Sequence, residues 1–216
     1  MDIITLFNDS LPSLLSGLSV TLRVAFVSLI IASFLGLIFG LMAIGTSKVL
    51  RAISTVYVDI IRGTPLIVQA FFIYFGLPSI FNFKMQAITA GIITISVNAG
   101  AYLVEIFRAG ILAIDNGQLE AARSLGLSYS QAMRKVILPQ AIRKMIPAFI
   151  NQFIISLKDT SLLSVIGIKE LTQSGEIIIA STYKAFEIWS IVGILYLVLI
   201  TMLSYFSRYI ERRLRV

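Results

Sequence analysis

The chain has 216 residues, of which 57% are hydrophobic and only 13% are charged, and it contains no histidine or cysteine. Soluble domains carry roughly a quarter charged residues, so most of this surface faces something other than water. Without histidine or cysteine, disulfides, thiolate chemistry, imidazole catalysis and nearly every zinc site are excluded. We therefore expect no metal, no cofactor and no enzymatic activity in this chain. The net charge of +7 is carried between apolar runs, which indicates membrane topology rather than nucleic-acid binding.

Five apolar runs are each long enough to cross a hydrocarbon layer of about 30 Å. They predict an all-α integral membrane protein with five transmembrane helices, built as a single domain over residues 1–216. The segment 2–16 before the first run is expected to form either a short helix in the outer interface or a frayed tail. The predicted spans are Leu18–Ile44, Ile53–Leu77, Ala87–Phe107, Ile146–Ile166 and Ile188–Phe206.

Basic residues set the orientation of these spans. Lysine and arginine collect after the first, third and fifth spans, and the positive-inside rule makes that side cytoplasmic. The N-terminus is then outside and the C-terminus in the cytoplasm, in a multi-pass protein of the plasma membrane, surrounded by lipid. The basic residues that carry this prediction are Lys48, Arg51, Arg108, Arg123, Arg134, Lys135, Arg143, Lys144, Arg208, Arg212, Arg213 and Arg215.

A cytoplasmic loop over about 112–145 separates the third and fourth spans. Asp115 or Asn116 is suited to cap a short helix over residues 118–125, and Gly126 supplies the left-handed residue that ends it. The sequence therefore predicts a defined helix in this loop.

A second helix is predicted directly after the first. Ser128 and Gln131 have the spacing of a capping box, and the helix that they open is expected to meet Pro139. The apolar residues of the two helices are more numerous than a solvated connector needs, so lipid, the bundle or a partner should cover them. These residues are Leu119, Ala122, Leu125, Leu127, Met133, Val136 and Ile137.

The same loop contains the motif E-A-A-x3-G-x9-V-I-L-P. Its spacing and its position resemble the E-A-A loop of the membrane subunits of ATP-binding-cassette importers, with valine at a position usually held by isoleucine. The resemblance implies that the loop is a coupling element in a cleft of a separate ATPase subunit. The residues that it assigns to this contact are Glu120, Ala121, Ala122, Gly126, Leu138 and Pro139.

Three further segments narrow the resemblance to the permeases of polar amino acids, of the histidine and glutamine type. They are Arg62-Gly63-Thr64-Pro65-Leu66 followed by Gln69, Glu105-Ile106-Phe107-Arg108, and Lys158-Asp159-Thr160-Ser161-Leu162. The family implies two ATPase subunits, a second permease subunit and an extracytoplasmic amino-acid-binding protein as partners. The permease pair is expected to be a homodimer, and a heterodimer is the alternative. The chain has no phosphate-binding lysine loop of its own.

Charged residues inside apolar spans are costly and are therefore candidates for function. Counting about 1.5 Å per helical residue puts three features near the membrane midplane: Gly63-Thr64-Pro65, Asn98 and Lys158-Asp159. Pro65 lacks an N–H group, so we expect the second span to break there and to offer backbone groups to a ligand. The alternative is that the intramembrane charges neutralise one another as buried pairs. These charges are Asp59, Arg62, Lys158 and Asp159.

The midplane residues suit an amino acid zwitterion, which needs partners of both signs. The surplus carboxylate of Glu105 and Asp159 favours a basic substrate such as arginine, lysine or histidine. The alternative is that these two residues bind the α-amino group that all amino acids share. The predicted substrate-binding residues are Thr64, Asn98, Glu105, Asp159 and Ser161. Translocation would follow alternating access that the separate ATPase drives.

Two other classes of protein fit the sequence less well. An ion-coupled secondary amino acid transporter would also explain intramembrane charges, but five spans without an inverted repeat and a docking loop argue against it. A structural membrane anchor would leave three polar breaks at one depth without a purpose.

Overall fold

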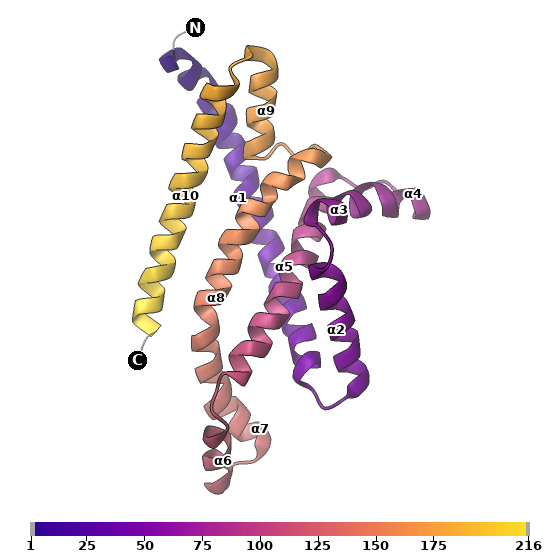
Figure 1. Ribbon diagram of the computed structural model, residues 1–216, viewed down its shortest axis with the longest axis vertical. Helices are drawn as coiled ribbons and strands as arrows, with labels where there is room; N and C mark the ends of the chain where they lie inside the picture. The colour runs from indigo at the N-terminus through magenta and orange to yellow at the C-terminus, as the bar shows by residue number, and fades with distance from the viewer. Residues whose placement is uncertain (1–2, 215–216) are drawn as a thin grey trace.

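The computed structural model describes residues 3–214, in which every regular element is a helix (Figure 1). The predicted all-helical membrane fold is confirmed. Four helices are long and apolar enough to cross a membrane, and the remaining predicted span is a helix pair bent by 102°. The elements are α1 (Ile3–Ile44), α2 (Lys48–Arg62), α3 (Leu66–Phe71), η1 (Phe72–Gly76), α4 (Leu77–Phe81), α5 (Ala87–Leu112), α6 (Asn116–Ser124), α7 (Tyr129–Ala132), η2 (Met133–Ile137), α8 (Leu138–Asp159), η3 (Thr160–Ile166), α9 (Leu171–Thr182) and α10 (Ala185–Leu214).

The N-terminal segment is helical, as one of the two predictions for residues 2–16 has it, but it is continuous with the first span as part of α1, and the alternative of a frayed tail is wrong from Ile3 onward. Residue 2 lies outside the described residues. The helix continues through Pro12 because its apolar face is covered: Leu6 and Leu14 are buried in a cluster with residues of α9 and α10. Burial of these side chains offsets the hydrogen bond that proline removes.

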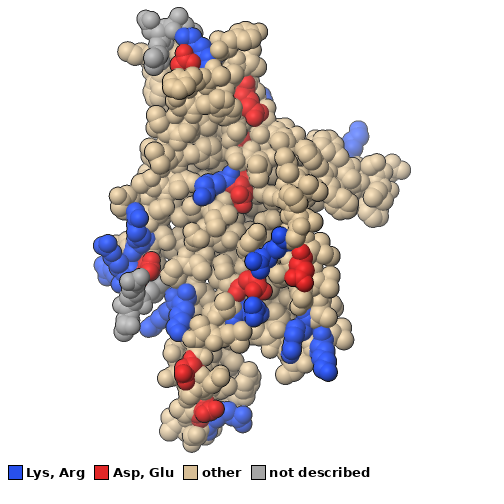
Figure 2. Space-filling model, viewed as in Figure 1, with Lys and Arg blue, Asp and Glu red and all other residues tan. Residues whose placement is uncertain are grey.

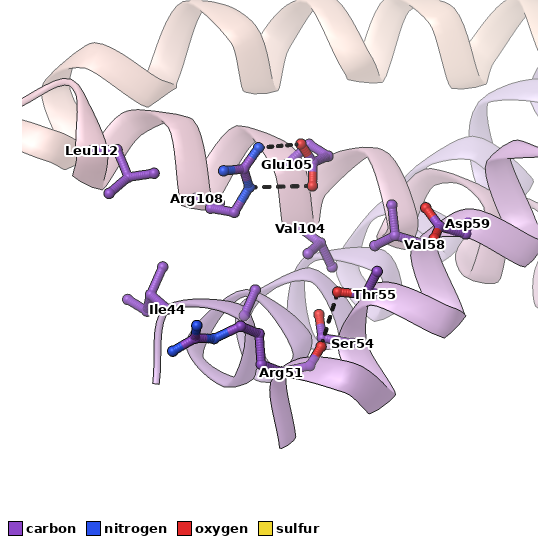
Figure 3. A pocket seen from close by; sticks show the side chains of 11 residues that line it. Ile44, Arg51, Ser54, Thr55, Val58, Asp59, Val104, Glu105, Arg108 and Leu112 are labelled. Atoms are coloured by element: carbon purple, nitrogen blue, oxygen red, sulfur yellow. Dashed lines mark hydrogen bonds and ion pairs between the residues drawn. The ribbon is translucent and has the colours of Figure 1, made fainter. Parts of the chain in front are cut away.

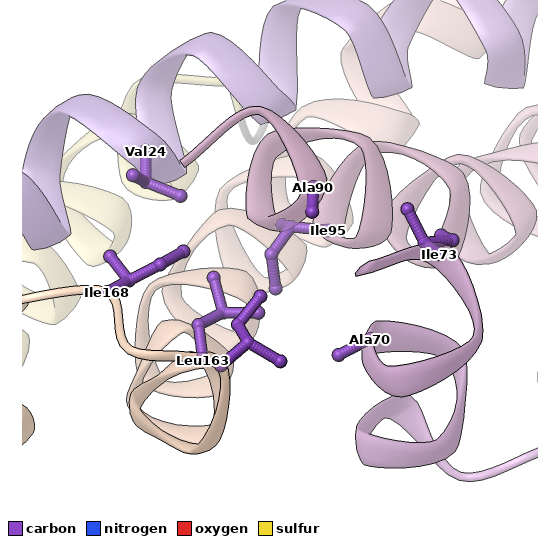
Figure 4. Packing of buried hydrophobic residues seen from close by; sticks show 8 residues of the cluster. Val24, Ala70, Ile73, Ala90, Ile95, Leu163 and Ile168 are labelled. Atoms are coloured by element: carbon purple, nitrogen blue, oxygen red, sulfur yellow. The ribbon is translucent and has the colours of Figure 1, made fainter. Parts of the chain in front are cut away.

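The centre of the bundle is the crossing of α1 and α5, and α10 lies against α8 and α9 at the side (Figure 1). Gly36 and Gly40 of α1 lie against Leu103 and Phe107 of α5, and the absence of side chains at these two positions lets the helix backbones approach closely. A second cluster joins α1 and α5 to the broken span and to η3 (Figure 4). Its members include Val24, Ala70, Ile73, Ala90, Ile95, Leu163 and Ile168.

The second helix of the cytoplasmic loop meets Pro139, as the sequence predicts, but it does not end there. The helix continues without a break from Tyr129 to Ile166. The turn before the proline is a π-helix, η2, in which the Leu138 N–H group donates to the Met133 carbonyl oxygen. This wider turn accommodates proline, which has no N–H group to donate. The helix therefore continues past Pro139 and is not ended by a kink.

The basic residues that predicted the cytoplasmic side gather toward one end of the bundle, where α6, α7 and the start of α2 lie (Figures 1 and 2). Arg215 lies outside the described residues. The N-terminal end of α1 lies at the opposite end (Figure 1). Between α8 and α10, residues 171–182 form a short helix, α9, which packs against α1.

Candidate functional site

The broken span places backbone groups inside the bundle. α2 ends at Arg62, and Pro65, with extended backbone angles, begins α3. Gly63 is required at the break because a Cβ atom there would lie 2.6 Å from the Asp59 carbonyl oxygen. The predicted break at Gly63-Thr64-Pro65 is confirmed.

The side chain of Gln69 holds this break in shape. Its Nε2 group donates to the Ile61 carbonyl oxygen at 2.7 Å and to the Thr64 carbonyl and hydroxyl oxygens at 3.0 and 2.9 Å. Its Oε1 atom accepts from Asn98 Nδ2 of α5 at 3.1 Å. Because Gln69 is nearly buried, losing it would leave these groups without partners at a cost of about 1–3 kcal/mol each.

A cavity of about 610 Å³ opens beside the break, and we call it the upper pocket. Three segments of the chain line it: the α2–α3 break, α5 and α8. The lining contains one cation, one carboxylate, two amides, a phenol and a hydroxyl, together with backbone groups of the break. The residues are Arg62, Gly63, Thr64, Pro65, Leu66, Asn98, Tyr102, Gln152, Ile155 and Asp159.

Arg62 and Asp159, the two charged residues of the upper pocket, do not form an ion pair with each other. The Arg62 guanidinium lies over the Tyr102 ring, 5.2 Å from its centroid. Within residues 3–214, none of the four intramembrane charges that could have neutralised one another forms an ion pair. The alternative of buried structural pairs is therefore wrong for Asp59, Arg62, Lys158 and Asp159, and the charges of Arg62 and Asp159 remain available to a ligand.

Three of the five predicted substrate-binding residues, Thr64, Asn98 and Asp159, line the upper pocket. Glu105 lies on the same face of α5 as Asn98 but seven residues away, about 10 Å along the axis, and it lines a second pocket. Ser161 follows Asp159 by two positions, so the two side chains do not share a face. Ser161 lines a groove of α8 and α10 with Lys158.

Sequence reasoning did not assign Gln69, Tyr102 and Gln152 to the site. Gln69 and Gln152 each carry an amide within a predicted apolar span, and that signal could have found them. Tyr102 gives no such signal, because a tyrosine within an apolar run is common. Its contact with Arg62 is visible only in the packed bundle.

The second pocket, which we call the lower pocket, lies closer to the cytoplasmic end and has a volume of about 510 Å³ (Figure 3). On one side of it, Glu105 and Arg108 of α5 form an ion pair at 2.9 Å. α2 contributes Arg51 and Asp59 from the other side, as Figure 3 shows. The pocket thus contains two cations and two carboxylates.

The cytoplasmic loop has the local structure that the sequence predicts. The Asp115 carboxylate accepts from the Gly117 N–H at 2.7 Å, and Ser128 and Gln131 form a capping box. Gly126 has a φ of 84°, the left-handed region. Lys144 Nζ of α8 donates to the Ala113 carbonyl oxygen at 2.8 Å, so this hydrogen bond joins the two ends of the loop to each other.

The bundle itself covers part of the loop's apolar surface. Leu119, Met133 and Val136 pack against a cluster that contains Ile137 and Met145. Leu125, at the tip, remains 85% exposed. The predicted coupling residues 120–122 lie on α6, and Leu138 and Pro139 begin α8.

A helical membrane bundle with a broken span, an intramembrane polar pocket and a capped cytoplasmic loop defines a transport permease. The family model for the inner membrane component of binding-protein-dependent transport systems matches residues 32–216. The chain belongs to this family, whose members work with a binding protein. The predicted resemblance to permease subunits of ATP-binding-cassette importers is confirmed, with the ATPase in a separate subunit and this chain as a multi-pass protein of the bacterial inner membrane.

Individual relatives cover almost the whole chain. The chain is 42% identical over 208 residues to the glutamine transport system permease protein GlnP of Escherichia coli strain K12, covering 96% of this chain and 95% of that protein. It is 38% identical to the arginine transport system permease protein ArtQ of Bacillus subtilis strain 168, with 95% and 94% covered. A crystal structure of an amino acid ABC transporter with histidines matches with a TM-score of 0.94 at 40% identity, covering 99% of each chain.

Proposed function

We propose that this chain forms the translocation path of an ATP-driven importer for a polar amino acid, and that the upper pocket binds the substrate. The observation that carries the proposal is that Arg62 and Asp159 line one intramembrane cavity and have no ion partner among residues 3–214. The Arg62 guanidinium suits the α-carboxylate, and the Asp159 carboxylate suits the α-ammonium group. Relatives named for glutamine and arginine transport support a polar substrate.

A basic substrate such as arginine, lysine or histidine is the finer form of this proposal. The upper pocket contains one cation and one carboxylate, which suit the two charges of any amino acid zwitterion, whether its side chain is basic or neutral. Asn98 and Gln152 add amide groups that suit a polar side chain. Preference for a basic side chain then depends on a further carboxylate, and Glu105 below the pocket is the nearest one along α5.

Transport measurements on the reconstituted complex test the substrate proposal. The chain is combined with its ATPase and binding protein in proteoliposomes, and ATP-dependent uptake of radiolabelled arginine, histidine and glutamine is measured. Asp159→Asn should lower uptake about 10- to 100-fold, because a hydrogen bond to a charged group contributes about 1.5–3 kcal/mol. Asp9→Asn, the same change outside both pockets, should leave uptake unchanged.

Two results would contradict different parts of the proposal. Unchanged uptake of all three amino acids by Asp159→Asn would remove the upper pocket from the path. Equal uptake of arginine and glutamine by the unaltered protein, with no effect of Glu105→Gln on their ratio, would remove only the basic preference.

We also propose that the cytoplasmic loop binds the ATPase and transmits its conformational change to the upper pocket. One continuous helix from Tyr129 to Ile166 joins the loop to Asp159, and a helix transmits displacement as a rigid body. The partners would be two ATPase subunits and a second permease, as a homodimer. Glu120→Arg should abolish co-purification of the ATPase, whereas retention of a normal amount would contradict the assignment.

A further inference from the structure

α2 has one polar face and one apolar face, although it lies in a predicted span. Arg51, Thr55, Asp59 and Arg62 follow one another at intervals of four, four and three residues, which places them on one stripe of the helix. The opposite face exposes large apolar side chains, as a lipid-facing surface does. These are Ile53, Val56 and Ile60, each about half exposed.

α5 carries a matching stripe. Asn98, Tyr102, Glu105 and Arg108 follow at intervals of four, three and three residues. The two helices are in contact, and the Tyr57 hydroxyl of α2 donates to the Val97 carbonyl oxygen of α5 at 2.7 Å. The two stripes therefore run side by side from the midplane toward the cytoplasm.

The upper and lower pockets divide this polar track between them. Arg62 and Tyr102, which are in contact, line the upper pocket. Asp59 and Glu105, one helical turn nearer the cytoplasm, line the lower pocket. One turn is about 5 Å, so the pockets adjoin each other at the Arg62–Tyr102 contact.

The lower pocket offers charged groups that its own residues leave free. Within the described part of the chain, the Asp59 carboxylate has no hydrogen bond or ion pair. The Arg51 guanidinium donates one N–H group to the Gly45 carbonyl oxygen at 3.0 Å, and its other guanidinium N–H groups have no partner there. Ser54 and Thr55 add hydroxyl groups between them (Figure 3).

We propose that the lower pocket is a second binding station for the transported amino acid, occupied after the upper pocket and before release into the cytoplasm. The proposal rests on the proposed function. The ammonium group would bind Asp59 beside Glu105, and the α-carboxylate would face Arg51 and Arg108. A substrate that leaves the upper pocket then exchanges Asp159 and Arg62 for new partners of the same two signs, so neither of its charges is left unpaired in the membrane.

Binding stoichiometry tests this inference separately from transport. The nucleotide-free complex of the permease with its ATPase is dialysed to equilibrium against radiolabelled arginine and, in parallel, glutamine. The unaltered protein should bind two molecules of its substrate per permease chain. Asp59→Asn and Arg51→Gln should each weaken the binding of one of these two molecules. Its affinity should fall at least about 10-fold, as expected when a hydrogen bond to a charged group is lost. Asp159→Asn should lose the other, and Asp9→Asn should keep both.

Each outcome supports or overturns the second station. It is overturned if the unaltered protein binds one molecule or none per chain while ATP-driven uptake proceeds. It is also overturned if both Asp59→Asn and Arg51→Gln keep two molecules at unchanged affinity. Failure of the proposed function is distinguishable, because the unaltered complex would then take up no amino acid at all.

Discussion

At the scale of single residues, Glu170, which lies outside the spans, joins three helices. Its side chain is fully buried. It accepts from the Thr172 and Gln173 N–H groups at 3.0 and 2.8 Å and from the Tyr196 hydroxyl at 2.9 Å, and Thr21 Oγ1 donates to it at 3.5 Å. It therefore caps α9 and ties it to α1 and α10. Burial raises the pKa of the Glu170 carboxyl, and the hydrogen bonds offset this rise only in part.

The pKa of Glu170 makes the stability of this corner depend on pH. Because the pKa of this acid is higher in the folded than in the unfolded state, the folded protein binds more protons between the two values, and stability falls as pH rises through that interval. The interval begins near the ordinary carboxyl value of 4.5. Glu170→Gln resembles the protonated form and should lack this decline.

Fluorescence of Trp189, the only tryptophan, reports melting of the purified protein. The melting temperature of the unaltered protein should fall relative to that of Glu170→Gln as pH rises from about 4.5. A difference between the two that is constant with pH, or that changes in the opposite direction, would refute the sign of the shift.

At the scale of elements, the turn between α6 and α7 depends on Gly126. Its φ of 84° disfavours any other residue, yet a Cβ atom there would have no neighbour within 4 Å. Alanine and leucine should therefore cost the isolated protein the same amount, about 1–2 kcal/mol for the left-handed backbone. Only a partner seated on the turn would distinguish a small side chain from a large one.

The measurement for this turn compares two properties of the same variants. Gly126→Ala and Gly126→Leu should lower the melting temperature equally, whereas Gly126→Leu should retain much less ATPase on co-purification. Gly193→Ala is the control, because this glycine also has no neighbour within 4 Å but has no positive φ. Equal retention of the ATPase by both Gly126 variants would mean that no partner occupies the space beside this turn.

At the scale of the whole molecule, the crossing of α1 and α5 holds the polar track in place. A Cβ atom on Gly36 would lie 2.5 Å from Leu103 Cβ, an atom that moves only with its helix. Gly36→Ala must therefore separate the two helices, and overpacking of this kind costs about 1–3 kcal/mol. Because α5 also carries Asn98 and Tyr102 into the upper pocket, uptake should fall together with stability.

Melting temperature and ATP-driven uptake of Gly36→Ala check this coupling, with Gly193→Ala again as the control. We expect both properties to decrease for Gly36→Ala and neither to decrease for Gly193→Ala. Normal stability of Gly36→Ala would show that the crossing adapts to the added methyl group.

The sequence by itself determined the features that rest on local signals. Hydropathy predicted the spans, and the basic residues predicted their orientation. Pro65 and Gly63 predicted the break in the second span. Capping residues predicted the loop helices because their hydrogen bonds close within three residues. Counting residues also gave the depth of Asn98 and Asp159.

Only the tertiary structure decided which residues of similar depth meet. The rotation of each helix about its axis is set by packing against its neighbours, as Gly36 on Leu103 sets α1 against α5, and counting residues does not reveal it. That rotation brings Tyr102 under Arg62. Gln69 gained its role in the same way, because the carbonyl oxygens that it binds become its neighbours only once the span is broken and bent.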